Sequence, residues 1–337
     1  MEKGLEDYKG VWTLGEVREG EIHPVSYELL AWGRGLADKL GVELSSIIIG
    51  HNVKDKVKEL IYRGADKVYV VDNPALKDFR ADPYSEILTS LVEEYKPEIF
   101  IASATTLGRT VMPICMIKLE TGLTADCTGL DIDLNERLLI QTRPAIGGNV
   151  MATIKTPSSR PQMSTVRPKS KRPLPRDDSK TGEVIVKEFS GEYLKSRVKT
   201  MDFLKEETIG APIQDADIVV SFGKGLKDAK NVGLINELAE LLGGSVGASR
   251  KVVDLGWISY SHQVGLSGKT VSPKLYIACG ISGAVQHMAG MSSAETVVAI
   301  NSDPEADIFS LADFGVAGDL FEVIPLLIKK LKERAME

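Results

Sequence analysis

The segment Tyr276–Met291, YIACGISGAVQHMAGM, decides how the second half of the chain folds. A short apolar run over 276–279 leads directly into small residues over 280–284, after which Gln286 and His287 begin a helical pattern. Small residues at such a junction let the backbone come close to a bound molecule, because free N–H groups and the dipole of the following helix converge there. The segment therefore predicts a strand, a glycine-rich turn and a helix.

Similar junctions follow most of the predicted strands in this half of the chain. In DADIVVSFGKGLKD (215–228) a buried strand ends beside Lys224, which lies between two glycines. Others occur in GGSVGASRKVVDLGW, HQVGLSGKTVSPKLYIACG, VVAINSDPEADIF and DFGVAGDLFEVI. The carboxyl ends of parallel strands meet at one edge of a sheet, and ligands bind in the crevice outside that edge. The sequence therefore predicts a Rossmann-like domain with a ligand cleft, although G-K-G lacks the spacing of a complete nucleotide motif.

The first half alternates predicted strands and helices, which indicates a second parallel sheet covered by helices. Apolar runs predict strands over 8–17, 44–50, 66–72 and 97–103. Apolar residues at helical spacing predict helices over 23–41, 53–64, 84–95 and 108–120.

The pattern then changes over residues 131–156, where antiparallel strands are expected with turns at an NE and a GG pair. We expect an α/β protein of two domains, 1–194 and 195–337, each with a mainly parallel sheet flanked by helices. The first would carry the antiparallel extension and a basic arm.

The basic arm is Arg160–Arg176, RPQMSTVRPKSKRPLPR, which has four prolines and no helical period. Proline cannot donate to a strand ladder, so this density favours an edge strand followed by a linker. Two interpretations of its charges stay open: a solvated connector, or an arm that reaches a partner or an anionic cofactor.

Composition excludes several classes of protein. A formal net charge of −6 gives no general attraction to nucleic acid, and Cys115, Cys127 and Cys279 lie too far apart for a metal or iron–sulfur motif. No apolar run approaches the roughly 20 residues that cross a bilayer. The charged N-terminus MEKGLEDYKG has no secretion signal, so we expect a cytoplasmic protein.

Several long segments of the sequence, in the same order along the chain, resemble the electron transfer flavoprotein α subunit. VGASR (246–250), residues 262–291 and residues 297–325 resemble the FAD-binding domain of that family, and TGLTADCTGL, TRPAIGGNVMATI and RPQMSTVRP resemble its N-terminal domain. The resemblance implies a DHS-like FAD-binding domain and a heterodimer with a β subunit that carries a second FAD or AMP. The chain would be an electron carrier between dehydrogenases or NADH and an acceptor, such as an acyl-CoA dehydrogenase, a quinone oxidoreductase or ferredoxin.

The resemblance also implies roles for residues at matching positions. Arg250 would lie beside the isoalloxazine, Ser267 would face flavin N5, and His287 would donate near the pyrimidine carbonyl. Cationic or donor groups there stabilise the negative charge that a reduced flavin acquires. The other expected contacts to FAD are Lys224, Ser249, Val264, Gly265, Leu266, Ser282, Gly283, Ala284, Val285, Gln286, Asn301, Asp319 and Leu320.

Two positions depart from the family pattern. Lys224 stands where arginine is common, and Leu266–Ser267 replaces a Gln–Thr pair. Lysine keeps the charge but loses the bidentate fork of arginine, and Leu266 removes an amide that could contact the ring, so FAD is expected to bind with an altered potential.

The basic arm resembles that of family members that bifurcate electrons more than that of mitochondrial ones. In bifurcating members, arginines of the first domain lie close to a flavin of the β subunit, which implies Arg143, Arg160 and Arg167 as contacts. Ferredoxin would then be a separate protein, since no cysteine cluster precedes the domain. From the residues alone, a DHS-like NAD- or nucleotide-binding enzyme and a scaffold that has lost its cofactor stay open.

Overall fold

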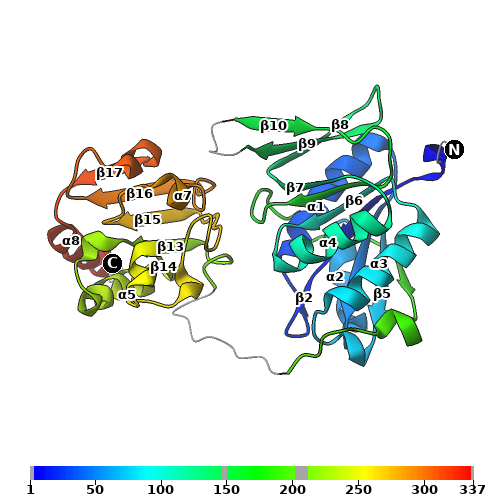
Figure 1. The fold of residues 1–337 in the computed structure, drawn as a ribbon, viewed down its shortest axis with the longest axis horizontal. Coiled ribbons are helices and arrows are strands. Elements are labelled where there is room, and N and C mark those ends of the chain that lie inside the picture. The colour runs from blue at the N-terminus through cyan, green and yellow to red at the C-terminus, as the bar shows by residue number, and fades with distance from the viewer. Residues whose placement is uncertain (1–3, 146–149, 202–211, 335–337) are drawn as a thin grey trace. The chain divides into compact units, whose positions relative to one another are not determined.

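The computed structural model describes residues 4–145, 150–201 and 212–334, and it divides into two compact units, 1–203 and 204–337 (Figure 1). The second unit begins at residue 204, whereas the sequence analysis expects it to begin at residue 195. Each unit has its own parallel sheet and its own hydrophobic clusters on the two faces of that sheet. The α/β class with two mainly parallel sheets is confirmed.

The first unit is built on a parallel sheet that has seven strands in the described part of the chain. In spatial order these are β12 (Glu183–Val186), β5 (Lys67–Asp72), β4 (Leu44–Gly50), β1 (Val11–Leu14), β6 (Ile99–Ser103), β11 (Gln162–Val166) and β7 (Leu123–Cys127). The order along the chain reverses beside β1, because the connections run from β1 to β4 and β5 on one side and return to β6 on the other.

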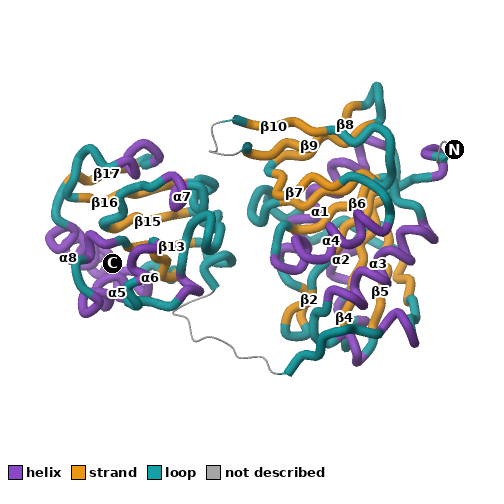
Figure 2. Tube along the Cα trace, in the orientation of Figure 1, coloured by secondary structure: helices purple, strands orange, loops and turns teal. Residues whose placement is uncertain are grey.

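Helices cover both faces of this sheet (Figure 2). The helices α1 (Val25–Leu40) and α2 (Lys58–Tyr62) pack on one face, and α3 (Ala81–Tyr95) and α4 (Thr106–Lys118) pack on the other. Alternate residues of β4 divide between the two cores: Leu44 and Ile48 join the first, Ile47 and Ile49 the second. Burial on both faces explains why the strands are continuously apolar in sequence.

A three-stranded antiparallel extension follows this sheet in the described residues, in the order β10 (Met151–Ile154), β9 (Leu138–Pro144) and β8 (Gly129–Asp133). The expected turn at Asn135–Glu136 joins β8 to β9. The expected glycine turn at 147–148 lies outside the described residues, and the Ala145 N–H donates to the Val150 carbonyl on either side of it, at 2.7 Å. A short hairpin of β2 (Val17–Arg18) and β3 (Glu21–Ile22) completes the unit.

The prediction of an edge strand in the basic arm is wrong. β11 lies between β6 and β7, pairs with both, and is buried at all five positions. Pro161 precedes it and Pro168 follows it, so the prolines flank the ladder and do not interrupt it. The high proline content of the whole segment led to the wrong prediction, because the strand itself contains no proline.

The rest of the arm packs on its own unit. The Arg176 Nε donates to Glu59 Oε2 at 2.9 Å, and the Leu174 carbonyl accepts from Arg63 Nη1 at 3.1 Å. The Lys171 ammonium lies 4.5 Å from the centre of the Trp32 ring. The chain then continues into β12, which pairs with β5 at the sheet edge. Most of residues 172–176 are exposed and lie in no helix or strand, so this part of the arm is a surface connector to β12 that these contacts hold on its own unit.

The second unit has a five-stranded parallel sheet among its described residues. The strands in spatial order are β14 (Ser245–Ala248), β13 (Ile218–Phe222), β15 (Leu275–Cys279), β16 (Thr296–Asn301) and β17 (Phe314–Ala317). Helices α5 (Val232–Leu241), α6 (Arg250–Asp254) and α8 (Leu320–Arg334) contribute to the core on one face. The other face is covered by loops and the four-residue helix α7 (Val285–Met288).

Replacement of Gly108 in α4 by alanine tests the packing of this helix on β6. A methyl group there would lie 1.9 Å from the Ser103 carbonyl oxygen. We expect Gly108→Ala to lower the free energy of unfolding by more than about 2 kcal/mol, although alanine is the better helix former. The matched control is Gly35→Ala in α1, where the methyl group meets only the Lys171 side-chain end at 3.3 Å. Denaturant titration that showed equal effects for both would contradict this packing.

Candidate functional site

A cleft of about 860 Å³ lies at the carboxyl edge of the second sheet. It is lined by residues at the ends of four strands: Gly223 after β13, Ser249 after β14, Gly280 after β15 and Asn301 as the last residue of β16. The strand order reverses between β13 and β15, because the chain proceeds from β13 to β14 on one side and from β15 to β17 on the other. The cleft therefore occupies the topological switch point at which open α/β sheets bind ligands.

Most of the expected cofactor residues lie together in this cleft. The lining includes Lys224, Ser249, Arg250, Val264, Gly265, Leu266, Ser267, Ser282, Ala284, Gln286, His287 and Asn301. Gly283, Val285, Asp319 and Leu320 do not line it in this structure. The Asp319 carboxylate accepts from the Phe321 N–H at 2.9 Å at the start of α8, and Leu320 is buried in the core.

Several glycines at the strand ends are required by contacts between loops. A Cβ on Gly225 would lie 2.7 Å from the Gly280 Cα, and a Cβ on Gly283 would lie 2.1 Å from the Ile308 nitrogen. Gly280 and Gly283 also have φ of +60° and +93°, which other residues rarely adopt. These small residues allow the loops to pack on one another, in addition to leaving backbone groups at the cleft.

Charges of both signs line the cleft. Lys224, Arg250 and Lys251 are the cations, and the Arg250 Nε lies 3.5 Å from Asp254. The carboxylates were missed by sequence reasoning: they are Asp254, Asp303, Glu305 and Asp307. Three of them follow β16 in the segment NSDPEAD, and their position after a strand was the available signal. Carboxylates at a strand end are the groups that bind ribose hydroxyls in dinucleotide folds.

The loop over 264–267 is held by hydrogen bonds on both sides. The Leu266 N–H donates to the Gln286 carbonyl at 2.8 Å, and the Tyr260 hydroxyl donates to the Ser267 carbonyl at 2.7 Å. The Ser267 Oγ accepts from Gln263 Nε2 at 3.0 Å, which directs the serine proton away from that amide. Such a hydroxyl can still donate to a ligand bound in the cleft.

His287 lines the cleft, but both of its ring nitrogens contact the protein. Its Nε2 lies 3.0 Å from the Tyr276 hydroxyl and its Nδ1 lies 3.1 Å from the Val264 carbonyl oxygen. Burial lowers the pKa of the imidazole to about 4 against a smaller upward effect of the bond to Val264. The ring is neutral at pH 7, and in this orientation its N–H faces Val264, whereas the sequence suggested a donor to the flavin.

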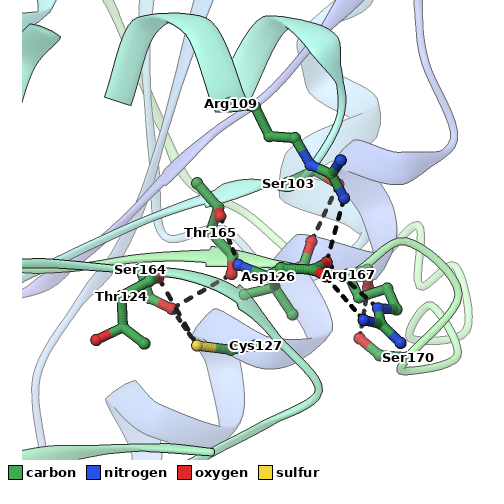
Figure 3. Close-up of polar contacts among 10 residues, drawn as sticks. Ser103, Arg109, Thr124, Asp126, Cys127, Ser164, Thr165, Arg167 and Ser170 are labelled. Atoms are coloured by element: carbon green, nitrogen blue, oxygen red, sulfur yellow. Dashed lines mark hydrogen bonds and ion pairs between the residues drawn. The ribbon is translucent and has the colours of Figure 1, made fainter. Parts of the chain in front are cut away.

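Of the three arginines expected near a partner flavin, Arg160 and Arg167 fall at opposite edges of the first sheet, and Arg143 lies in the antiparallel extension. Arg167 follows β11 at the carboxyl edge, where its Nη2 lies 2.7 Å and its Nε 3.2 Å from the Asp126 carboxylate (Figure 3). Arg143, on β9, is close enough to Cys127 to lower the pKa of that thiol, although burial raises it more strongly. Arg143 and Arg167 thus lie near the carboxyl ends of β9 and β11, and both are close to the end of β7, at Cys127 and Asp126.

Arg160 precedes β11 and therefore lies at the amino edge of the sheet. It is only 8% exposed, and its guanidinium donates to the carbonyls of Thr156, Ser159 and Arg137 at 3.0–3.3 Å. The structure does not bring it together with Arg143 and Arg167.

Asp126 and Arg109 were missed by the sequence analysis. The Asp126 carboxylate also accepts from Arg109 Nη2 at 3.3 Å, so it joins two guanidinium groups (Figure 3). Asp126 has φ of +61°, and its N–H donates to the Thr165 hydroxyl at 2.9 Å at an irregular step between β11 and β7. A non-glycine residue in this conformation is strained and often marks a functional site. No pattern in the sequence distinguishes Asp126 from an ordinary strand residue.

Two classes of site receive no support within the described ranges. No group of three or more His, Cys, Asp or Glu residues there could hold a metal ion. No helix there is both long and apolar enough to span a bilayer.

Fold and site together define an α/β protein with a cofactor cleft in its second domain, lined by cations, strand-end glycines and a neutral histidine. Residues 11–191 match the electron transfer flavoprotein domain, and residues 212–292 match the electron transfer flavoprotein FAD-binding domain. The chain belongs to the electron transfer flavoprotein family. FAD is accordingly the cofactor of the second domain, and the strand-end amides and Lys224 fit its anionic diphosphate.

Similar proteins extend over nearly the whole chain. The electron transfer flavoprotein subunit alpha of Thermoanaerobacterium thermosaccharolyticum is 52% identical over 98% of this chain and 99% of its own length. That of Megasphaera elsdenii is 45% identical over 98% of both. The LctC subunit of a lactate dehydrogenase (NAD(+), ferredoxin) of Acetobacterium woodii is 41% identical over 96% of this chain and 77% of its own length. The resemblance to the α subunit is confirmed, and FAD is favoured over the NAD-binding alternative.

The neutral state of His287 has a measurable consequence for stability. An unfolded imidazole has a pKa of about 6.5, so the unfolded chain takes up a proton first as the pH falls. The contribution of His287 is therefore complete above pH 6.5 and decreases between about pH 6.5 and pH 4, by roughly 2 kcal/mol at pH 5.

We expect the melting temperature of wild type to fall relative to His287→Asn, which cannot titrate, when the pH changes from 7.5 to 5. Calorimetry of the complete protein at the two pH values measures this difference. A gap that does not depend on pH would show that folding does not lower the pKa of the imidazole.

Proposed function

We propose that the chain is the α subunit of a heterodimer with an electron transfer flavoprotein β subunit. The heterodimer accepts electrons from a dehydrogenase or NADH and passes them to an acceptor. The observation that carries this proposal is the cleft at the β13–β15 switch point, in a domain that matches the FAD-binding domain of the family. Bound FAD supplies the redox chemistry, and the protein supplies binding, orientation and charge.

The side chains around the cleft divide this work. Lys224 and the backbone amides after β13 and β15 bind the diphosphate, since the N–H groups of strand-end turns converge on anions. Ser267 donates to the flavin ring from the loop described above. Arg250, at the start of α6, provides the positive charge beside the ring, and its loose pairing with Asp254 leaves guanidinium donors for a ligand.

Substitution of Arg250 tests the role of this charge. We expect Arg250→Gln to lower the potential at which bound FAD accepts its first electron, because a charge-assisted hydrogen bond to the reduced ring is lost. Such a bond is worth roughly 1.5–3 kcal/mol, which corresponds to roughly 65–130 mV for one electron at about 59 mV per tenfold change.

The measurement is a reductive titration of the heterodimer followed by absorbance. Arg250→Lys is the control, since it keeps the charge and should restore most of the potential. An unchanged potential in Arg250→Gln with FAD still bound would remove Arg250 from the site.

A finer proposal is that the heterodimer bifurcates electrons, with ferredoxin as one acceptor. It is supported by similarity to the LctC subunit, whose name includes NAD(+) and ferredoxin. It is supported also by the arginines at the carboxyl edge of the first sheet. Arg109 and Arg167 share the Asp126 carboxylate, so two positive charges face one negative charge. The excess positive charge suits a reduced flavin or a phosphate held by the β subunit.

Single substitutions of these arginines by glutamine test the finer proposal. We expect Arg143→Gln or Arg167→Gln to lower the potentials of the flavin in the β subunit and to slow NADH-driven ferredoxin reduction with a cognate dehydrogenase. The FAD of this chain should keep its potential, because it binds in the other domain. Arg176→Gln is the control, since that side chain pairs with Glu59 and Asp178 of its own unit. If all variants match wild type in both assays, the arginines have no part in bifurcation.

A further inference from the structure

A buried hydrogen-bonded chain connects the second sheet to the loop at the cleft. Tyr276, on β15, is 0% exposed, and its hydroxyl lies 3.0 Å from Nε2 of His287 on α7. The opposite nitrogen of the ring, Nδ1, lies 3.1 Å from the Val264 carbonyl oxygen. The three groups belong to a strand, a helix and a loop that are separate in sequence.

The chemistry of the three groups fixes the proton positions. The Val264 carbonyl can only accept, so Nδ1 must carry the hydrogen. In a neutral ring Nε2 must then accept, and the Tyr276 hydroxyl is its donor. Burial raises the pKa of this hydroxyl, so it keeps its proton at every pH at which the protein is used. The two hydrogen bonds therefore point in the same direction: Tyr276 donates to His287, and His287 donates to Val264.

The loop over 264–267 and α7 are joined by other contacts as well. The Leu266 N–H donates to the Gln286 carbonyl, and the Val271 N–H donates to the Gly290 carbonyl, both at 2.8 Å. A Cβ on Gly290 would lie 2.4 Å from the Gly265 nitrogen, so the two backbones are in direct contact. Loop and helix thus form one body, and the Tyr276–His287 bond attaches that body to the sheet.

We propose that Tyr276 is a positioning residue of the FAD site, which acts through His287 to hold the 264–267 loop at the cofactor. Gly265, Leu266 and Ser267 line the cleft from this loop, so its position sets their distances to the ring. In this arrangement His287 acts as a neutral ring through its two hydrogen bonds and carries no positive charge. The proposal rests on binding of FAD in the cleft described above.

Two substitutions of His287 separate its hydrogen bond to Tyr276 from its hydrogen bond to Val264. An asparagine places an amide N–H near the position of Nδ1 and can still donate to Val264. A glutamine reaches the position of Nε2 and can still contact Tyr276, but it leaves the Val264 carbonyl without that donor. Tyr276→Phe removes the hydroxyl alone. All variants are made in the heterodimer co-expressed with its β subunit.

We expect FAD to dissociate roughly tenfold faster from Tyr276→Phe and from His287→Gln than from wild type, because each loses one buried hydrogen bond that holds the loop. His287→Asn keeps the Val264 bond but loses the contact with Tyr276, so its FAD should dissociate about as fast as that of Tyr276→Phe, and the one-electron potential of FAD should shift in all three variants. Tyr84→Phe is the control. It removes another buried hydroxyl, bonded to the Ile49 carbonyl at 3.1 Å in the first domain, and should lower stability without any change at FAD.

The ring nitrogens can be observed directly by ¹⁵N NMR of histidine-labelled heterodimer, with FAD bound and after its removal. The expected spectrum shows a protonated Nδ1 and an unprotonated Nε2 that shifts in Tyr276→Phe. A protonated Nε2 in wild type, or unchanged FAD dissociation and potential in both Tyr276→Phe and His287→Gln, would overturn the proposal. If wild type bound no FAD, the proposed function would fail, and the spectrum of the cofactor-free protein would still test the Tyr276–His287–Val264 chain.

Discussion

The reversal of strand order beside the first strand of each sheet is the constraint on which the cleft depends. Connections between parallel strands are right-handed, so those that proceed in opposite directions along a sheet cover opposite faces. In the second unit α5 lies on one face, between β13 and β14, and α7 on the other, between β15 and β16. The backbone therefore diverges at the ends of β13 and β15, and a ligand can enter between the two loops.

The two faces of that sheet are covered unequally, which explains why the cleft loops need so many specific contacts. A helix satisfies its own backbone groups, as α5 and α8 do on one face. The four-residue α7 and its neighbouring loops cannot do so on the other, where their groups bond between segments. The close glycine contacts and the bonds of His287 take the place of a longer helix there.

Much of this architecture follows from apolar patterning, whereas the placement of charges does not. The strand over 44–50 was evident as an apolar run because it is buried on both faces, and the helix over 84–95 because burial of one face imposes a helical period. The opposite positions of Arg160 and Arg167 also follow from strand geometry, since a five-residue strand spans about 16 Å, but only once β11 is known to be a strand. The αL conformation of Asp126 and the partners of His287 arise from tertiary contacts between distant segments, which periodicity does not record.

The two units use arginine in different ways, and the difference lies in how each guanidinium is paired. Arg167 makes a bidentate contact to Asp126 at 2.7 and 3.2 Å and is largely buried, so much of its charge is compensated within the unit. Arg109 shares that carboxylate through one longer contact and is half exposed. Arg250 is 69% exposed and has a single 3.5 Å contact to Asp254. A cation in a rigid pair contributes a fixed local field, whereas one in a loose contact can reorient toward an incoming anion. In the first unit, therefore, Arg109 is better placed than Arg167 to respond to a ligand, although only Arg167 belongs to a motif that the sequence makes conspicuous.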